Sequence, residues 1–332
     1  MSQVTRGNRI VATSLITAGF VLPGAMTVHA QGNYPDRPIR LIVPFSPGGQ
    51  TDTMSRAVGN AISPILGEQI VVDNRTGAAG TIGTGEAARA DADGYTLLMG
   101  TASTHAIHPT MTSRITYDAI KDFAPVRALG TGPMTISVHP SVPIRTLKRL
   151  ITDIKSHPNK YLYGTAGVGS VNHLGGELFK LRAGKLKVVH VPYKGAGPAV
   201  ADLIGGQIPM ACTSLNSVLP HHRSGRLRTL AVMKEARSVS APDIPTAVES
   251  GVKGAVAYTF NVIVAPKGTP RGVIDKLNGV LGQIMADKAF VDSLVRFGVD
   301  PITDSSPEMA AAMINTEIER WRPLIESLGL KN

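Results

Sequence analysis

Hydrophobic and polar positions alternate along this chain with two periods, one typical of strands and one typical of helices. Residues 39–43 form a short run of aliphatic side chains, which predicts a buried strand. From residue 54 to residue 65 apolar side chains recur every three or four positions, which predicts an amphipathic helix. The turn between them, 44–52, contains the adjacent glycines Gly48 and Gly49. The pattern therefore predicts a strand, a glycine-rich turn and a helix.

The same order recurs through the rest of the first half of the chain. The expected elements are a strand at 70–74, a glycine-rich turn at 76–81, a helix at 82–90, a strand at 95–99 and a cluster of small hydroxyl residues at 100–105. Strands that alternate with helices over short connections indicate a parallel sheet with helices on both faces. Ligands of such sheets bind beyond the carboxyl ends of the strands, which is where these turns lie.

A second series of elements follows a long extended stretch. Residues 124–138 are expected to be extended, with an interruption at 131–133, and to cross between two domains. Later strands are expected at 160–163, 187–191, 208–212, 228–233 and 260–264, and helices at 144–154, from 171, at 199–204, over 274–284 and from 307. The last helix carries Met309, Met313, Ile318 and Trp321. Pro323 is expected to kink or end it, because proline cannot donate the helical hydrogen bond.

The N-terminus has the features of a secretory signal peptide. Arg6 and Arg9 precede an apolar run over 10–22, and the segment 28–30 (VHA) offers a small-residue cleavage site after Ala30. We expect residues 1–30 to be removed on export, with a retained amphipathic anchor as the alternative. Cleavage would remove two arginines and no acid, and so lower the formal net charge from +10 to +8.

Composition narrows the classes of partner. The chain has 332 residues, of which 43% are hydrophobic and 17% charged, as in ordinary globular proteins. Only 5% are aromatic and like charges do not form blocks, so nucleic-acid binding has no stacking platform or basic stripe behind it. The positive charge fits an anionic small ligand or an anionic envelope surface. Cys212 is alone, and we expect it to be a small buried apolar residue.

Catalytic and metal-binding residues do not form recognised patterns. The chain has no Gly-x-Ser-x-Gly motif, and its nine histidines show no His-x-x-x-His spacing. His105 and His108 are expected in a loop. Ser170 and His173 lie three residues apart at a helix start, so capping and packing explain them better than a catalytic triad does. We expect no metal and no cofactor.

The turns instead offer hydrogen-bond donors. Glycine main chain, threonine and serine hydroxyls, one tyrosine and helix N-termini occur at strand ends in both halves of the chain. Such donors suit a carboxylate that is held without being transformed. Asp52 or Thr51 is expected to cap the first helix. Asp52 is expected to fix the turn rather than face the anion, because a carboxylate there would repel it.

Seven segments, in a fixed order, carry a resemblance to a known family. They are 34–39 (YPDRPI), 44–52 (PFSPGGQTD), 74–80 (NRTGAAG), 93–98 (DGYTLL), 163–170 (YGTAGVGS), 191–195 (VPYKG) and 265–270 (APKGTP). They resemble the Bug family, the periplasmic solute-binding proteins of tripartite tricarboxylate transporters, over essentially the mature chain.

The resemblance implies an α/β fold, that of a two-lobed, type II-like periplasmic binding protein. Two parallel-type sheets flanked by helices are expected, joined by two crossing strands. Lobe 1 would comprise residues 31–130 and about 228–332, with the final segment packing partly on lobe 2, and lobe 2 would comprise about 131–227. The implied partners are a small organic carboxylate, held partly through ordered waters, and a membrane permease of one large and one small subunit. We expect a monomer.

The implied binding residues lie in four loops, 45–52, 101–105, 165–170 and 193–195, and at one further strand end. They are Phe45, Ser46, Gly48, Gly49, Thr51, Asp52, Thr101, Ser103, Thr104, Thr165, Gly167, Gly169, Ser170, Tyr193, Gly195 and Thr213. Where the family often has Phe-Asp, this chain has Cys212 and Thr213, and where it often has Trp, this chain has Phe260. The first departure removes a charge near the distal end of the ligand and argues against a cationic or amino-bearing ligand.

Two other functions stay open at the level of sequence. A sensor partner would bind the same ligand and pass a signal rather than deliver cargo. A periplasmic hydrolase or lyase would use the same fold for a reaction. The chosen interpretation is a binding protein for a di- or tricarboxylate or an aromatic acid, without turnover.

Overall fold

The strands of this protein are hydrogen-bonded into one mixed sheet. The computed structural model describes residues 1–3, 34–112 and 114–331, and every element lies in one compact unit, residues 35–332. The strands are β1 (Ile39–Val43), β2 (Ile70–Asn74), β3 (Thr96–Thr101), β4 (Phe123–Val138), β5 (Leu162–Thr165), β6 (Val189–Pro192), β7 (Met210–Ser214), β8 (Arg228–Val232), β9 (Tyr258–Pro266) and β10 (Asp300–Pro301). Their order is β2-β1-β3-β9-β4-β7-β5-β6, and β8 and β10 also pair with β4. The expected signal peptide, residues 1–30, lies almost wholly outside the described residues.

The pairing corrects the expectation of parallel-type sheets. Strands β1, β2 and β3 pair in parallel, and so do β5, β6 and β7. Between these two groups, however, β9 runs antiparallel to β3 and β4, and β4 runs antiparallel to β7. The sheet is therefore mixed, because the two long central strands return in the opposite direction to their neighbours.

Strand β4 is continuous over 16 residues, so the expected interruption at 131–133 is wrong. Its first part pairs with β9 as far as Pro133, and its last part, 134–138, pairs with β7. The backbone N–H of Met134 continues the hydrogen bonding to the carbonyl of Ala257 at 2.8 Å. Pro133 costs the strand one donor only, and the register shifts of the β4–β9 pair lie before it, between residues 125 and 130.

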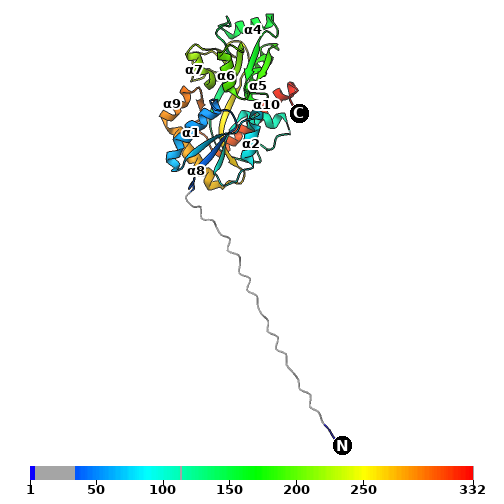
Figure 1. Ribbon diagram of the computed structural model, residues 1–332, viewed down its shortest axis with the longest axis vertical. Helices are drawn as coiled ribbons and strands as arrows, with labels where there is room; N and C mark the ends of the chain where they lie inside the picture. Colours follow the sequence, from blue (N-terminus) through cyan, green and yellow to red (C-terminus); the bar gives the residue numbers. More distant parts are fainter. Residues whose placement is uncertain (4–33, 113, 332) are drawn as a thin grey trace. The chain divides into compact units, whose positions relative to one another are not determined.

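Helices flank both groups of strands (Figure 1). They are α1 (Gln50–Leu66), α2 (Thr81–Ala88), α3 (His108–Met111), α4 (Leu147–Ser156), α5 (Val171–Arg182), α6 (Ala196–Ile204), α7 (Leu215–Arg223), α8 (Arg271–Ala286), α9 (Lys288–Arg296) and α10 (Pro307–Ser327), with a 3₁₀ turn at Ala78–Gly80 and a π-helical turn at Ser103–Ile107. Figure 1 shows α4, α5, α6 and α7 around the β5–β7 group and α1, α2 and α8 around the β1–β3 group. Helices α7 and α9 and the short strand β10 were not predicted. None of the helices among the described residues is long and apolar enough to span a membrane.

The predicted apolar stripe of α8 is confirmed, whereas the expectation that Pro323 ends α10 is wrong. Ile274, Leu277, Leu281 and Ile284 of α8 are all buried. In α10 the helix continues past Pro323 to Ser327. Met309 is 49% exposed, whereas Trp321 is buried and donates from Nε1 to Glu317 at 3.1 Å. Ser306 caps the first turn of α10, because its hydroxyl accepts a hydrogen bond from the backbone N–H of Met309.

Candidate functional site

The first glycine-rich turn connects β1 to α1 without a side-chain cap. Gly49 is the N-cap residue, and no side chain accepts a hydrogen bond from the first turn there, so the expectation that Asp52 or Thr51 caps α1 is wrong. Gly48 has a φ of +82°, the left-handed region that glycine adopts without strain. Because the cap is a glycine, the N–H groups of the first turn stay available to a ligand.

Asp52 fixes this turn from inside α1, as the third helical residue. Its carboxylate accepts from the backbone N–H of Gly48 at 3.0 Å, from Arg56 at 2.9 Å and from the Asn74 amide at 3.0 Å. Burial alone would raise the pKa of Asp52, but the hydrogen bonds from Arg56, Gly48 and Asn74 outweigh it and hold the pKa below its ordinary value. Asn74 also donates to the carbonyl of Phe45 at 2.9 Å. The carboxylate is thus occupied by the turn and by Arg56.

The hydroxyl cluster after β3 is helical and buried rather than a loop. Strand β3 runs to Thr101, and His105 and His108 lie in the π-helical turn and in α3, which corrects their expected place. Thr104 Oγ1 accepts from the backbone N–H of Thr101 at 3.1 Å and lies 2.9 Å from His105 Nδ1. Burial lowers the pKa of His105 to about 3, so its ring is neutral at physiological pH. Thr104 therefore supports the backbone of this segment.

In the second series of elements, the capping interpretation of Ser170 is confirmed. Its hydroxyl accepts from His173 N–H at 3.2 Å and donates to the Gly167 carbonyl at 2.6 Å. The next residue, Val171, donates its backbone N–H to Ser103 Oγ at 3.0 Å. Gly167 and Gly169, with φ of +120° and +76°, give the loop its tight path. Thr165 is turned to His190, whose Nε2 lies 2.6 Å from its hydroxyl.

In the loop between β6 and α6, the backbone is available to a ligand, whereas the hydroxyl of Tyr193 is bound within the protein. Tyr193 donates its hydroxyl to Asp202 at 2.7 Å, and burial together with this carboxylate raises its pKa to about 12. Gly195, the N-cap of α6, has a φ of +156° and no side chain caps it. Ser46 reaches across and donates to the carbonyl of Lys194 at 3.1 Å. Contacts from Ser46 and from Ser103 thus join the loops that follow β1 and β3 to those that precede α6 and α5.

A cavity of about 40 Å³ lies where these loops meet. Six of the predicted binding residues line it: Phe45, Ser46, Gly49, Thr51, Thr101 and Ser103. The other predicted residues do not line it: Gly48, Asp52, Thr104, Thr165, Gly167, Gly169, Ser170, Tyr193, Gly195 and Thr213. Several of them support the lining residues, as described for Asp52, Thr104 and Ser170.

Eight lining residues were not among the predicted binding residues, although Gln50 and Ala166 lie within the predicted binding loops 45–52 and 165–170. They are Gln50, Met134, Ala166, Val171, Asn172, Ala196, Ser214 and Thr259. Four of these are the first or second residues of helices α1, α5 and α6, so the start of a helix after a glycine turn was the available signal. Met134 and Thr259 come from the long strands β4 and β9, and only the tertiary pairing brings them there.

Four helices begin at this cavity. Gln50, Val171 and Ala196 are the first residues of α1, α5 and α6, and Ser214 is the N-cap of α7. At α1, α6 and α7 no side chain caps the first turn. A helix N-terminus carries about half a positive charge and free N–H groups. The converging N-termini therefore make the cavity favourable for an anion.

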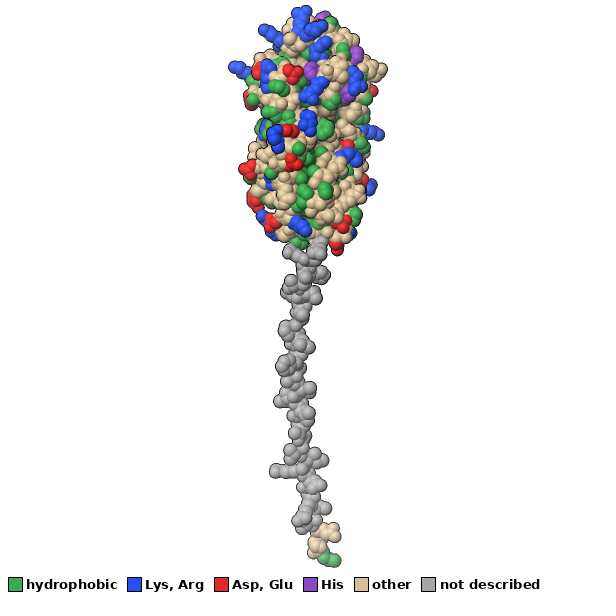
Figure 2. Space-filling view, turned by 90° about the vertical axis from the view of Figure 1, so that its left-hand side faces the viewer, with side chains coloured by type: hydrophobic (Ala, Val, Ile, Leu, Met, Phe, Trp, Pro, Cys, Tyr) green, Lys and Arg blue, Asp and Glu red, His purple; other side chains and the backbone are tan. Residues whose placement is uncertain are grey.

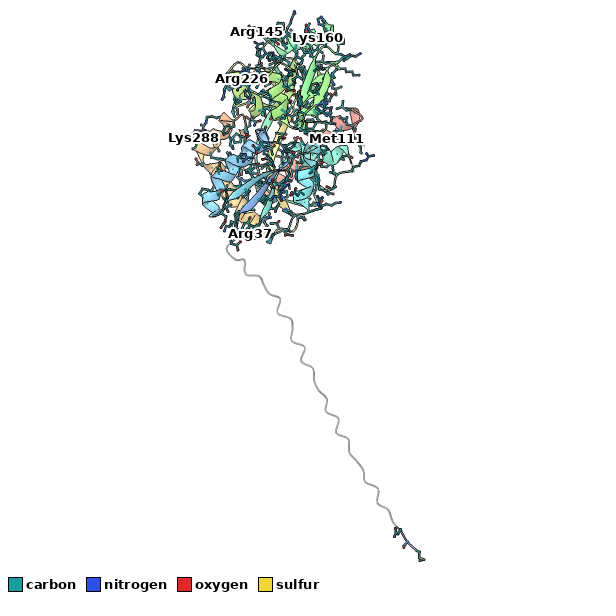
Figure 3. All side chains as sticks on the ribbon, viewed as in Figure 1. Arg37, Met111, Arg145, Lys160, Arg226 and Lys288 are labelled. Atoms are coloured by element: carbon teal, nitrogen blue, oxygen red, sulfur yellow. The ribbon has the colours of Figure 1, made fainter. Side chains whose placement is uncertain are left out.

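The residues that line the cavity include no Lys or Arg. Figure 2 shows lysine and arginine side chains on the outer face of the molecule, crowded at its upper end and mixed with acidic ones below. In Figure 3 the labelled Arg145, Lys160, Arg226 and Lys288 lie at the periphery, and all four are exposed. Recognition of an anion in the cavity would therefore depend on backbone donors and hydroxyls rather than on ion pairs.

Comparison with known proteins identifies the family. Residues 54–330 match the model described as tripartite tricarboxylate transporter family receptor. The chain belongs to this family. The TctC receptors are periplasmic solute-binding proteins of transporters, not enzymes, and the expectations of a Bug-like receptor without catalytic turnover are therefore confirmed.

Individual relatives of this TctC receptor are similar over nearly their whole length. The Bordetella pertussis protein BugT is 37% identical over 99% of both chains. An R. palustris protein solved with adipate is 32% identical and has a TM-score of 0.86, covering 89% of this chain and 98% of its own. MatC from Rhodopseudomonas palustris with bound malate is 29% identical and has a TM-score of 0.83, covering 88% and 100%. These structures show the α/β periplasmic binding-protein fold.

Proposed function

We propose that this receptor captures a small carboxylate, a di- or tricarboxylate or an aromatic acid, and delivers it to a membrane permease of one large and one small subunit. The observation that carries the proposal is the convergence of four helix N-termini on a cavity lined without cations. The adipate and malate bound by the two R. palustris relatives are of this ligand class. The protein would act as a monomer, with no cofactor and no nucleic acid.

The proposed binding mode places the ligand between two lobes. Lobe 1 would comprise 31–130 and about 228–332, and lobe 2 about 131–227. Strands β4 and β9 would be the crossing strands, since β4 pairs with β9 and β10 in one part and with β7 and β8 in the other. Because β8 pairs with the same part of β4 as β7, we place β8 in lobe 2 and move the proposed return to lobe 1 from residue 228 to β9.

The size of the cavity supports a closing motion. A volume of about 40 Å³ has room for only a few water molecules, because each occupies roughly 10–15 Å³ of such a cavity. A dicarboxylate therefore enters only if the loops separate and then re-close around it. The contacts of Ser46 with Lys194 and of Ser103 with Val171 would form in the closed state.

Export through the signal peptide at residues 1–30 is part of the proposal, because the family is periplasmic. N-terminal sequencing of protein from the cell envelope is expected to start at Gln31. A start at Met1 would contradict cleavage.

A thermal-shift screen of mono-, di- and tricarboxylates and aromatic acids tests the proposal. An acid present at about a hundred times its Kd should stabilise the folded state by about 2.7 kcal/mol. The matched control is the neutral amide of the best acid, which keeps the shape but removes the charge. Melting temperatures that rise with amines or sugars, and with none of the acids, would overturn the ligand class.

Delivery is separable from sensing. Deleting the permease genes should abolish uptake of the identified acid while the receptor still binds it. A cell that keeps uptake but loses the transcriptional response to the acid when the receptor is deleted would instead identify a sensor partner.

A further inference from the structure

Two buried amides meet beside the cavity. Gln50, the first residue of α1, is 4% exposed, and Asn261, in the middle of β9, is fully buried. Gln50 Nε2 donates to Asn261 Oδ1 at 2.9 Å. A Cβ atom at Gly132 of β4 would overlap the side-chain amide of Gln50, so the glycine leaves the slot that this side chain occupies. The pair is thus held by the sheet and by the start of α1.

Each amide keeps one polar atom without a partner. Gln50 Oε1 and Asn261 Nδ2 are buried and form no hydrogen bond within the protein. If both amides were turned over, the shared bond would be kept and Gln50 Nε2 and Asn261 Oδ1 would be left instead. One acceptor and one donor therefore remain in either orientation. Leaving such groups unpaired is costly, so they favour a ligand that completes them.

The pair adjoins the space where the ligand would lie. Gln50 lines the cavity together with Thr51 of α1 and Thr259 of β9. Asn261 follows Thr259 by two positions on β9, and alternate residues of a strand share a face of the sheet. A carboxylate does not suit both free atoms of the pair, because it has no proton to donate to the free acceptor. The chemical group that faces the pair should therefore be neutral and polar.

We propose that Gln50 and Asn261 determine specificity by recognising a hydroxyl on the carbon chain of the carboxylate. This inference rests on the proposed function and names the ligand class within it. A hydroxyl donates one hydrogen bond and accepts another, which matches the free acceptor and the free donor. A carboxylate cannot donate, an ammonium group cannot accept, and a methylene group does neither. The receptor therefore prefers hydroxy-acids over the same acids without the hydroxyl.

The test is calorimetric titration of the mature protein with matched acids, malate against succinate and 2-hydroxyglutarate against glutarate. We expect at least one hydroxy-acid to bind tenfold or more tightly than its partner. Gln50→Met keeps the length of the side chain and removes its polar atoms, so it should reduce this ratio to within about twofold. The matched control is Gln207→Met, the same change at an exposed position, which should keep the ratio.

The outcomes separate the two proposals. Equal affinities within each pair, or a ratio that survives in Gln50→Met, would overturn the hydroxyl assignment while leaving a carboxylate receptor. If none of the four acids binds but another acid of the thermal-shift screen does, the hydroxyl assignment is overturned for these chains; failure of every acid in that screen would overturn the proposed function itself. If Gln50→Met does not fold by its melting curve, the ratio measured on the unmodified protein decides alone.

Discussion

The hydroxyl of Ser103 accepts a hydrogen bond of 3.0 Å from the backbone N–H of Val171, the first residue of α5. The two residues are 68 positions apart, and each belongs to a different group of strands: Ser103 follows β3 and Val171 follows β5. Both line the cavity. This bond joins the two sides of the site and satisfies the N–H group of the first residue of α5.

The first prediction concerns this bond. Ser103→Ala should weaken ligand binding by about two- to twelvefold, because a net hydrogen bond contributes roughly 0.5–1.5 kcal/mol. Titration calorimetry measures the affinity, and Ser224→Ala, an exposed serine, is the matched control. An unchanged affinity in Ser103→Ala would mean that the bond is unimportant for the ligand-bound state.

Gly49 offers a sharper test of the cavity. A Cβ at this position would have only the Ser46 carbonyl oxygen within 4 Å, at 3.7 Å, and its φ of −81° suits any residue. Gly49→Val should therefore fold with a stability within about 1 kcal/mol of the original protein, yet lose ligand binding by tenfold or more as the branched side chain fills the cavity. Chemical denaturation and calorimetry measure the two effects separately. Full binding by a folded Gly49→Val protein would place the ligand elsewhere.

Asp52 should make stability depend on acid pH. Its pKa is lower in the folded protein than in the unfolded chain, so its charged form stabilises the fold at neutral pH. This contribution is fully present above the unfolded pKa of about 3.9 and is lost as pH falls through the lower folded pKa. Asp52→Asn should therefore be less stable than the original protein at pH 7, by about 1–3 kcal/mol. The difference should shrink on acidification between about pH 5 and pH 2.

Urea denaturation of both proteins at pH 7 and pH 3 measures this difference. A stability difference that is larger at pH 3 than at pH 7 would contradict the assigned role.

Ligand binding supplies an independent check on the place of Asp52. Because the carboxylate is occupied by Gly48, Arg56 and Asn74, Asp52→Asn should keep most of the affinity. Much tighter binding by Asp52→Asn would mean that Asp52 repels the ligand directly.

The buried His105 should contribute to acid sensitivity at a higher pH. Its pKa is lowered from 6.5 to about 3 by burial, so the unfolded chain takes up the proton first. The free energy of unfolding therefore loses nothing to His105 above about pH 6.5. Below that pH it falls by up to about 1.4 kcal/mol per pH unit. His105→Asn should reduce the change in unfolding free energy between pH 7 and pH 5. If the unfolding free energy of His105→Asn changes as much between pH 7 and pH 5 as that of the original protein, the effect belongs to other histidines. His108 is one of these, because burial lowers its pKa to about 4.

Local periodicity predicted the alternating strands and helices well, because each short apolar run is long enough to define its own element. The N-terminal strand, the helix α1 and the apolar stripe of α8 needed no tertiary information. The direction of β9 and the continuity of β4 did need it. A strand that passes through Gly132 and Pro133 is held by its neighbours, whereas local propensity favours a break there.

The candidate site shows the same division. The glycine turns were visible as motifs, and so were Ser46, Gly49 and Ser103, which line the cavity. Helix starts such as Gln50 and Ala196 carry no side-chain signature for a backbone donor. Tyr193 was predicted to bind the ligand, but its hydroxyl donates a hydrogen bond to Asp202 instead. The sequence does not indicate this contact between residues nine positions apart.

The central claim is that backbone donors at converging helix starts hold a carboxylate without a cation. Calorimetric titration with the acid that gives the largest thermal shift, alongside its neutral amide, tests it most directly. The account predicts that the acid binds and that its amide binds at least a hundredfold more weakly, because the partial charges at the helix N-termini stabilise only the anion. Equal binding of the acid and the amide would contradict it.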